Sequence, residues 1–221
     1  MNSTKDKAVV FDMDGVLFDT ERLCMDMWAK VADARGLCGM IQVGYDSIGR
    51  NENDTRALAL AAFGEDFDFE DFRAEVSRMC HDYVDAKGIP VKKGVQELLD
   101  FLKEQGYRIA LASSTRKESV LRNLERGGIR EYFEEVISGD MVEHSKPRPD
   151  IYLLACDKLG VKPEVAYAIE DSPNGIRAAH GAGMKPIMVP DLIAADEEMK
   201  LLSLVILEDL LAVKEYLAAN I

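Results

Sequence analysis

The chain has 221 residues, of which 48% are hydrophobic, and a formal net charge of −13 from 27 basic and 40 acidic residues. This length is sufficient for one domain or for a domain with an insertion, and the negative charge disfavours non-specific binding to nucleic acid or to an anionic membrane. No apolar stretch is long enough to cross a bilayer and the first residues lack the apolar region of a signal peptide, so we expect a cytoplasmic protein.

Residues 8–11 form a short apolar run without alternation, which predicts a strand buried on both faces. Asp12 and Asp14 follow it, and because they are two residues apart their side chains lean the same way in an extended segment. Gly15 comes next, where a chain can leave a strand. Two neighbouring carboxylates repel each other unless a cation lies between them, and oxygen ligands suit Mg²⁺. A solvated acidic turn is the alternative.

Residues 20–88 contain no convincing strand pattern. The spacing of hydrophobic residues predicts helices over 20–36, 55–63 and 70–86. The polar stretch 46–53, which a glycine interrupts, is predicted to be a loop. We therefore expect a block of helices inserted between the first strand and the rest of the chain.

Beyond residue 90, strands and helices alternate, which predicts a parallel sheet covered by helices on both faces. Strands are expected at 107–112, 135–138, 165–169, 186–189 and 203–207. Helices are expected at 95–105, 115–126, 149–159, 174–182 and 208–218. Thr115 and Glu118 have the spacing of a capping box, which places the start of the second of these helices at Thr115.

Polar groups follow three of the predicted strands, and a fourth group lies in a loop. They are Asp12 and Asp14, Ser113 and Ser114, Lys146, and Glu170 and Asp171. Ligands of parallel sheets bind beyond the carboxyl ends of the strands, so we expect these groups to converge. Taken singly, the serines are also typical helix caps, the lysine a typical surface residue and the acidic pair a typical turn.

These stretches resemble, in the same order, the four motifs of the haloacid dehalogenase-like (HAD) phosphohydrolases. They read DMDGVLFDT from Asp12, SST from Ser113, KPRP from Lys146 and EDSPNG from Glu170. The resemblance covers nearly the whole chain and is closest to the β-phosphoglucomutase-like phosphatases. It implies a Rossmann-like α/β core formed by residues 1–19 and 91–221, with helices on both faces of its sheet. Residues 20–90 would form an inserted α-helical cap.

The resemblance also implies a role for each acidic residue. Asp12 would be the nucleophile that takes the phosphoryl group, and Asp14 the general acid and base. Mg²⁺ would be held by the Asp12 carboxylate, the Asp14 backbone carbonyl and Asp171. Glu170 would act on the same metal from its outer shell.

Phosphate binding would fall to Ser113, with backbone N–H groups beside it at Ser114, and to Lys146, which offsets the charge of the phosphoryl group. Thr20 completes the first motif. Three residues of the predicted 46–53 loop are candidates for substrate contact, with a solvated loop as the alternative: Arg50, Asn51 and Asn53.

Two reactions are compatible with the resemblance. β-Phosphoglucomutase has a histidine just after its first motif, a lysine in its cap and a cap arginine. Aligning Trp28 and Tyr83 with the same residues of that enzyme places Cys24 where the histidine would be and Met79 where the lysine would be. Glu52 stands where the cap arginine would be. These three departures favour hydrolysis over a sugar-phosphate mutase, which remains the alternative.

Other classes fit less well. A haloacid dehalogenase would lack the second aspartate, and a phospho-ligand binding protein without activity would be expected to lose Asp12, Asp14 or Asp171, all of which are present. The sequence therefore predicts a Mg²⁺-dependent phosphatase, acting as a monomer on a small phosphorylated metabolite such as a sugar phosphate.

The cysteines have no CxxC spacing and form no metal-binding motif with the three histidines. We expect them to be reduced thiols. They are Cys24, Cys38, Cys80 and Cys156.

Overall fold

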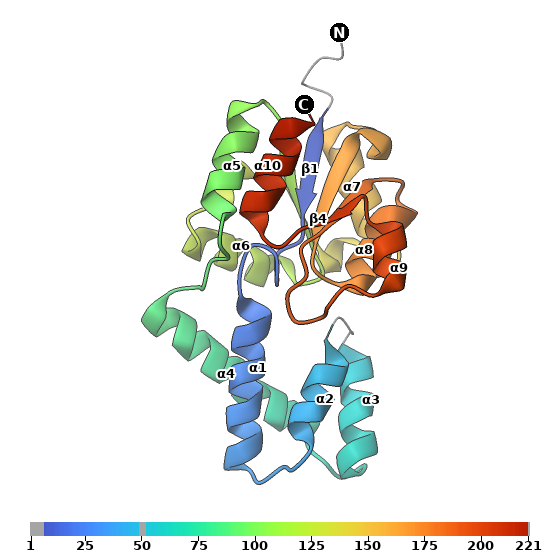
Figure 1. Cartoon of the computed structure of the whole chain (residues 1–221). Helices are drawn as coiled ribbons and strands as arrows, with labels where there is room; N and C mark the ends of the chain where they lie inside the picture. The colour runs from blue at the N-terminus through green and yellow to red at the C-terminus, as the bar shows by residue number, and fades with distance from the viewer. Residues whose placement is uncertain (1–6, 49–51, 221) are drawn as a thin grey trace. The chain divides into compact units, whose positions relative to one another are not determined.

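The computed structural model describes residues 7–48 and 52–220 (Figure 1). Its centre is a six-stranded sheet in which all neighbouring strands are parallel, with the order β3-β2-β1-β4-β5-β6. The strands are β1 (Ala8–Phe11), β2 (Arg108–Ser113), β3 (Glu135–Ser138), β4 (Ala166–Glu170), β5 (Lys185–Met188) and β6 (Val205–Ile206). The predicted α/β fold class with a parallel sheet is confirmed.

The strand order reverses at β1, because the chain first adds β2 and β3 on one side and then β4, β5 and β6 on the other. Such a reversal opens a crevice at the carboxyl ends of the central strands, where ligands of parallel sheets bind. The carboxyl ends of β1, β2 and β4 are therefore neighbours, although they are far apart in the sequence.

Helices connect the strands and cover the sheet. They are α5 (Val95–Glu104), α6 (Lys117–Arg126), α7 (Asp150–Leu159), α8 (Pro173–Gly181), α9 (Glu197–Leu202) and α10 (Leu210–Ala219), with 3₁₀ turns at Arg130–Tyr132, Gly139–Met141 and Pro163–Val165. α7 and α8 contact each other and the central strands, and α5 lies beside α10 (Figure 1).

The strands are apolar without alternation because both faces of the sheet are buried. All four residues of β1 are fully buried. Val10 and Ala168 share one core cluster with Tyr152 of α7 and Ala179 of α8. The end of α7 that carries Tyr152 is thus held against the centre of the sheet.

The chain forms two compact units, Met1–Asp19 with Pro90–Ile221, and Thr20–Ile89. Over its described residues, the second unit has helices joined by short turns, and no strand. They are α1 (Thr20–Ala34), α2 (Met40–Ser47), α3 (Glu52–Phe63) and α4 (Phe69–Lys87). α1 packs against α2 and α4, and α3 packs against α2. The inserted helical block is therefore present, while its identity as a substrate cap stays a proposal.

The prediction of a loop over 46–53 is wrong in part. α2 includes residues 46 and 47, and Asn53 belongs to α3. The glycine that interrupts this stretch, Gly49, lies outside the described residues. Gly44 lies within α2, where its lack of a side chain serves packing. A Cβ atom there would lie 3.0 Å from Nε1 of Trp28, so the glycine lets α2 approach α1 closely.

The remaining predicted helices and strands agree with the structure to within two residues at each end, apart from the first turn of α3. α9 was not predicted, because six residues are too few to show a helical period. Within the described ranges, every helix is too short or too polar to span a membrane.

Candidate active site

Asp12 lies at the carboxyl end of β1, beside β4. Its N–H donates to the carbonyl oxygen of Ile169 at 2.9 Å, so the parallel pairing of β1 with β4 extends to this residue. The side chain is only 11% exposed. The backbone at this carboxylate is therefore fixed by the sheet itself.

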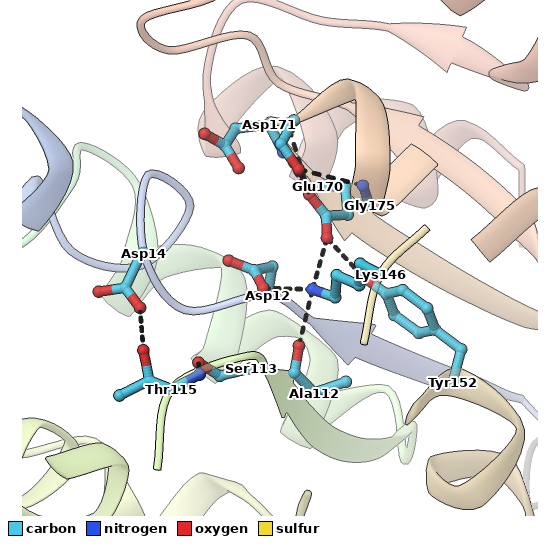
Figure 2. Close-up of polar contacts among 11 residues, drawn as sticks. Asp12, Asp14, Ala112, Ser113, Thr115, Lys146, Tyr152, Glu170, Asp171 and Gly175 are labelled. Carbon is cyan, nitrogen blue, oxygen red and sulfur yellow. Dashed lines mark hydrogen bonds and ion pairs between the residues drawn. The ribbon is translucent and has the colours of Figure 1, made fainter. Parts of the chain in front are cut away.

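Lys146 reaches the same point from the loop between β3 and α7 (Figure 2). Its Nζ contacts Oδ1 of Asp12, lies 2.6 Å from Oε1 of Glu170 and donates to the carbonyl oxygen of Ala112 at 3.0 Å. An ammonium group has three N–H donors, and these three acceptors come from the ends of β1, β4 and β2. The lysine side chain is 7% exposed, so it is not a surface residue.

Glu170, the last residue of β4, is fully hydrogen-bonded. Besides Lys146, its Oε1 accepts the hydroxyl of Tyr152 at 2.8 Å. Its Oε2 accepts the N–H groups of Asp171 and Ser172 at 3.1 and 3.2 Å and the Ser172 hydroxyl at 3.1 Å. A carboxylate that is 1% exposed requires this number of donors.

Two glycines leave room for these acids. Gly175 lies in the first turn of α8, and a Cβ atom there would overlap the Glu170 carboxylate. Gly15 has φ +82°, and a Cβ atom there would overlap the Asp171 carboxylate. The backbone after Asp12 therefore lies directly against Asp171, whose side chain is buried.

The buried acids form a cluster that suits a metal ion. One carboxylate oxygen from each of Asp12, Glu170 and Asp171 lies within 4.8 Å of the other two. Lys146 is the cation that contacts Asp12 and Glu170. Three carboxylates beside one ammonium leave an excess of negative charge in a buried place, which a further cation would neutralise.

The pKa values reflect this charge. Burial raises the pKa of Asp12 to about 7, with Lys146 acting in the opposite direction and Glu170 and Asp14 raising it further. Burial lowers the pKa of Lys146, but the Asp12 and Glu170 carboxylates outweigh it and raise the pKa above its ordinary value. Lys146 is therefore held as a cation.

The end of β2 contributes Ser113 and the residues after it. Ser113 is buried, and its Oγ accepts the N–H of Thr115 at 3.1 Å. Ser114 is exposed. The Thr115 hydroxyl donates to Oδ2 of Asp14 at 3.0 Å, which connects the end of β2 to the segment after β1.

The predicted capping box at Thr115 is wrong. α6 begins at Lys117, and the side chain of its N-cap residue, Arg116, makes no capping hydrogen bond. The N–H of Lys117 instead donates to Oδ1 of Asp140 at 3.1 Å. Because Thr115 lies two residues before the helix, its hydroxyl is available to Asp14.

The structure thus brings together Asp12, Lys146, Glu170 and Asp171, with Ser113 at the end of the adjacent strand (Figure 2). The remaining candidates belong to the helical unit or lie outside the described residues. Thr20 is the first residue of α1 and Asn53 is an exposed residue of α3. Arg50 and Asn51 lie outside the described residues.

Sequence reasoning missed Tyr152, Ser172 and the role of Thr115. Ser172 carried a signal, because it precedes Pro173 and is the N-cap residue of α8. Tyr152 carried none, since its hydroxyl meets Glu170 only once α7 is packed on the sheet.

Comparisons with known proteins agree with this geometry. Residues 7–183 match the family model described as haloacid dehalogenase-like hydrolase. The chain is 34% identical over 181 residues to the phosphorylated carbohydrates phosphatase of Thermotoga maritima, covering 82% of this chain and 83% of that one. It is 33% identical to hexitol phosphatase B of Escherichia coli, with 83% of each chain covered.

Solved structures agree as well. CbbY from Rhodobacter sphaeroides in complex with phosphate superposes with a TM-score of 0.74 at 28% identity, covering 92% of this chain and 94% of that one. The family match spans most of the chain and includes the strand-end residues that form the buried cluster. The chain therefore belongs to the haloacid dehalogenase-like hydrolases, among the β-phosphoglucomutase-like and CbbY-like phosphatases that carry a helical cap.

Proposed function

We propose that this phosphatase is Mg²⁺-dependent and hydrolyses a small phosphorylated metabolite, a sugar phosphate, through an aspartyl-phosphate intermediate on Asp12. The observation that carries the proposal is the buried cluster of three carboxylates, two of which contact Lys146. A phosphate dianion approaching these carboxylates alone would be repelled, so the site needs a second positive charge.

The residues present fit a hard divalent cation, because all the candidate ligands are carboxylate or carbonyl oxygens. Asp12 and Asp171 would hold the ion directly, together with the backbone carbonyl of Asp14. Glu170 already accepts hydrogen bonds at both oxygens and would act from the outer shell. When bound, Mg²⁺ supplies positive charge that favours ionised Asp12 and stabilises the oxygens of the phosphoryl group.

In the first step, a carboxylate oxygen of Asp12 attacks phosphorus and the bond from phosphorus to the sugar oxygen breaks. Asp14 gives its proton to that oxygen, which leaves as an alcohol. In the second step, Asp14 takes a proton from a water molecule, the water oxygen attacks phosphorus, and the bond to Asp12 breaks. Inorganic phosphate is released and both aspartates return to their first state.

The other side chains position the two aspartates and neutralise the negative charge of the phosphoryl group. Lys146 holds one oxygen of Asp12 and leaves the other on the side away from its ammonium (Figure 2). The ammonium also offsets charge on the phosphoryl group. Ser113 would bind a phosphoryl oxygen, with the backbone N–H of Ser114 beside it. The Thr115 hydroxyl orients Asp14 for proton transfer.

The relatives support the substrate class. Their names describe phosphatases of phosphorylated carbohydrates, of hexitols and of fructose 1-phosphate. A sugar-phosphate mutase remains the alternative, and Cys24 and Met79 favour hydrolysis because neither supplies the histidine or lysine of β-phosphoglucomutase.

The experiment is a panel of hexose, pentose and hexitol phosphates assayed for released phosphate with Mg²⁺ and with EDTA. We expect hydrolysis of at least one sugar phosphate with Mg²⁺, none with EDTA, and none by the Asp12→Asn variant, whose circular dichroism should match the parent. A mutase would instead release no phosphate and interconvert a hexose 1-phosphate only with a hexose bisphosphate primer. Activity that persists in Asp12→Asn would overturn the nucleophile assignment.

A further inference from the structure

The helical unit contains a pair of thiols that hydrolysis does not use. Cys24 of α1 and Cys80 of α4 have their sulfur atoms 3.6 Å apart. Neither forms a disulfide. They are far apart in the sequence and have no motif spacing, so only the packing of the two helices reveals them.

The packing of α1 against α4 fixes this pair. The helices run antiparallel, since higher residue numbers in α1 meet lower numbers in α4. Nη1 of Arg35 lies 2.8 Å from Oδ2 of Asp71. The Trp28 ring packs edge-on against the Phe72 ring, with the ring centroids 4.8 Å apart. The thiols are the next contact along the same interface, so they do not meet by chance rotation of two surface side chains.

We propose that Cys24 and Cys80 are a reversible dithiol–disulfide pair, oxidised by a hydroperoxide and reduced again by a dithiol. The sulfur atoms have to approach from 3.6 Å to about 2.05 Å for a disulfide to form. α1 follows the point where the chain enters the helical unit, and α4 precedes the point where it leaves. The bond would therefore tie the two ends of this unit together.

The surroundings suit this chemistry. A hydrogen bond from Cys24 lowers the pKa of the Cys80 thiol, although partial burial opposes it. The thiolate is the reactive form of cysteine. Cys24 is exposed, which gives an oxidant and a reductant access to the pair.

Oxidation of the pair takes two steps. The Cys80 thiolate attacks one oxygen of the hydroperoxide, the O–O bond breaks, and Cys80 becomes a sulfenic acid. The departing hydroxide or alkoxide takes up the proton that the Cys80 thiol had released and leaves as water or an alcohol. The Cys24 sulfur then attacks the sulfenic sulfur, its proton leaves with the hydroxide as water, and the S–S bond forms. The two cysteines lose two electrons, which the peroxide accepts.

The other two cysteines provide contrasts within the same chain. Cys156 is buried in the core, and burial followed by the charge of Glu164 raises its pKa to about 11. Cys38 is exposed and lies between α1 and α2. We expect neither to enter the disulfide.

The test uses the full-length protein, reduced and then treated with one to a few equivalents of hydrogen peroxide. Peptide mass spectrometry without reductant should find the peptides of Cys24 and Cys80 linked, with two thiols lost per chain and recovered by dithiothreitol. The Cys38→Ser variant should behave like the parent. Cys80→Ser and Cys24→Ser should each lose the linked peptide, and the exposed position of Cys24 keeps its variant folded.

Circular dichroism melting provides a second readout. The oxidised parent should unfold at a higher temperature than the reduced parent, and this rise should be absent in Cys24→Ser. The proposal is overturned if the peroxide converts these cysteines to sulfinic or sulfonic acid without linking them, or if the links found join Cys38 or separate chains. None of these results bears on phosphate release, so the proposed hydrolysis is tested independently.

Discussion

At the scale of single residues, the ammonium group of Lys146 compensates the charge of the buried carboxylates. Its ammonium contacts two carboxylates and a backbone carbonyl, and its side chain is almost fully enclosed. Removing one partner from a buried charge cluster leaves the other charges uncompensated. We therefore expect the lysine to contribute both to the stability of the fold around the site and to the neutralisation of phosphate.

We predict that Lys146→Met lowers the free energy of unfolding by about 3 kcal/mol and abolishes phosphate release. The free energy is measured by urea unfolding without added metal. The matched control is Lys93→Met, since Lys93 forms an ion pair with Asp209 at 2.7 Å but has a side chain that is 71% exposed. Surface pairs contribute little, so this variant should keep both stability and activity. Equal losses in the two variants would contradict the buried role of Lys146.

At the scale of elements, the first turn of α8 positions the acids of β4. Ser172 caps the helix by accepting the N–H of Gly175 at 3.1 Å, and the same hydroxyl donates to Glu170. Pro173 follows at the first helical position, where its missing N–H costs nothing. The absence of a side chain at Gly175 lets the Glu170 carboxylate lie against the helix.

We predict that Gly175→Ala lowers the free energy of unfolding by about 1–3 kcal/mol and reduces hydrolysis, because the added methyl group displaces Glu170. Gly181→Ala is the control at the other end of α8, where an added Cβ would lie 3.8 Å from Pro149. Alanine is the better helix former, so this variant should be as stable as the parent or more so. Urea unfolding and the phosphatase assay compare the stability and activity of the two variants. A Gly175→Ala variant as stable and as active as the parent would refute the argument that Gly175 makes room for Glu170.

The element scale also shows what the sequence can and cannot predict. The end of β1 was predictable because a buried apolar run, two aspartates and a glycine follow one another directly. Tyr152 and Thr115 were not, because their hydroxyls meet Glu170 and Asp14 only in the folded chain. α2 was not predicted, because its eight residues, Met40–Ser47, are too few to show a clear helical period.

At the scale of the whole molecule, a strongly acidic chain has to attract a phosphate anion. The net charge is −13, and the acids of the cluster add local negative charge to it. A bound divalent cation would resolve this conflict and would also stabilise the fold, since it would bind the native state and not the unfolded one.

We predict that Mg²⁺ raises the melting temperature, by an amount that corresponds to about 2.7 kcal/mol when its concentration is a hundred times its dissociation constant. EDTA should reverse the rise. Asp171→Asn should lose the response to Mg²⁺, because it removes a charged ligand. Glu198→Gln should keep it, because Glu198 pairs with Arg177 at 2.6 Å on the surface. A response that survives in Asp171→Asn would place the metal elsewhere.

The central claim is that the Asp12 carboxylate carries the phosphoryl group between the sugar and water. The most direct measurement is rapid quenching of the enzyme during turnover of its best sugar phosphate, followed by borohydride reduction and peptide mass spectrometry. An acyl phosphate on Asp12 would be reduced to homoserine at that position, and the Asp12→Asn variant would show no such product. The account predicts homoserine at residue 12 alone, and its absence during active turnover, or its appearance at another aspartate, would contradict the account.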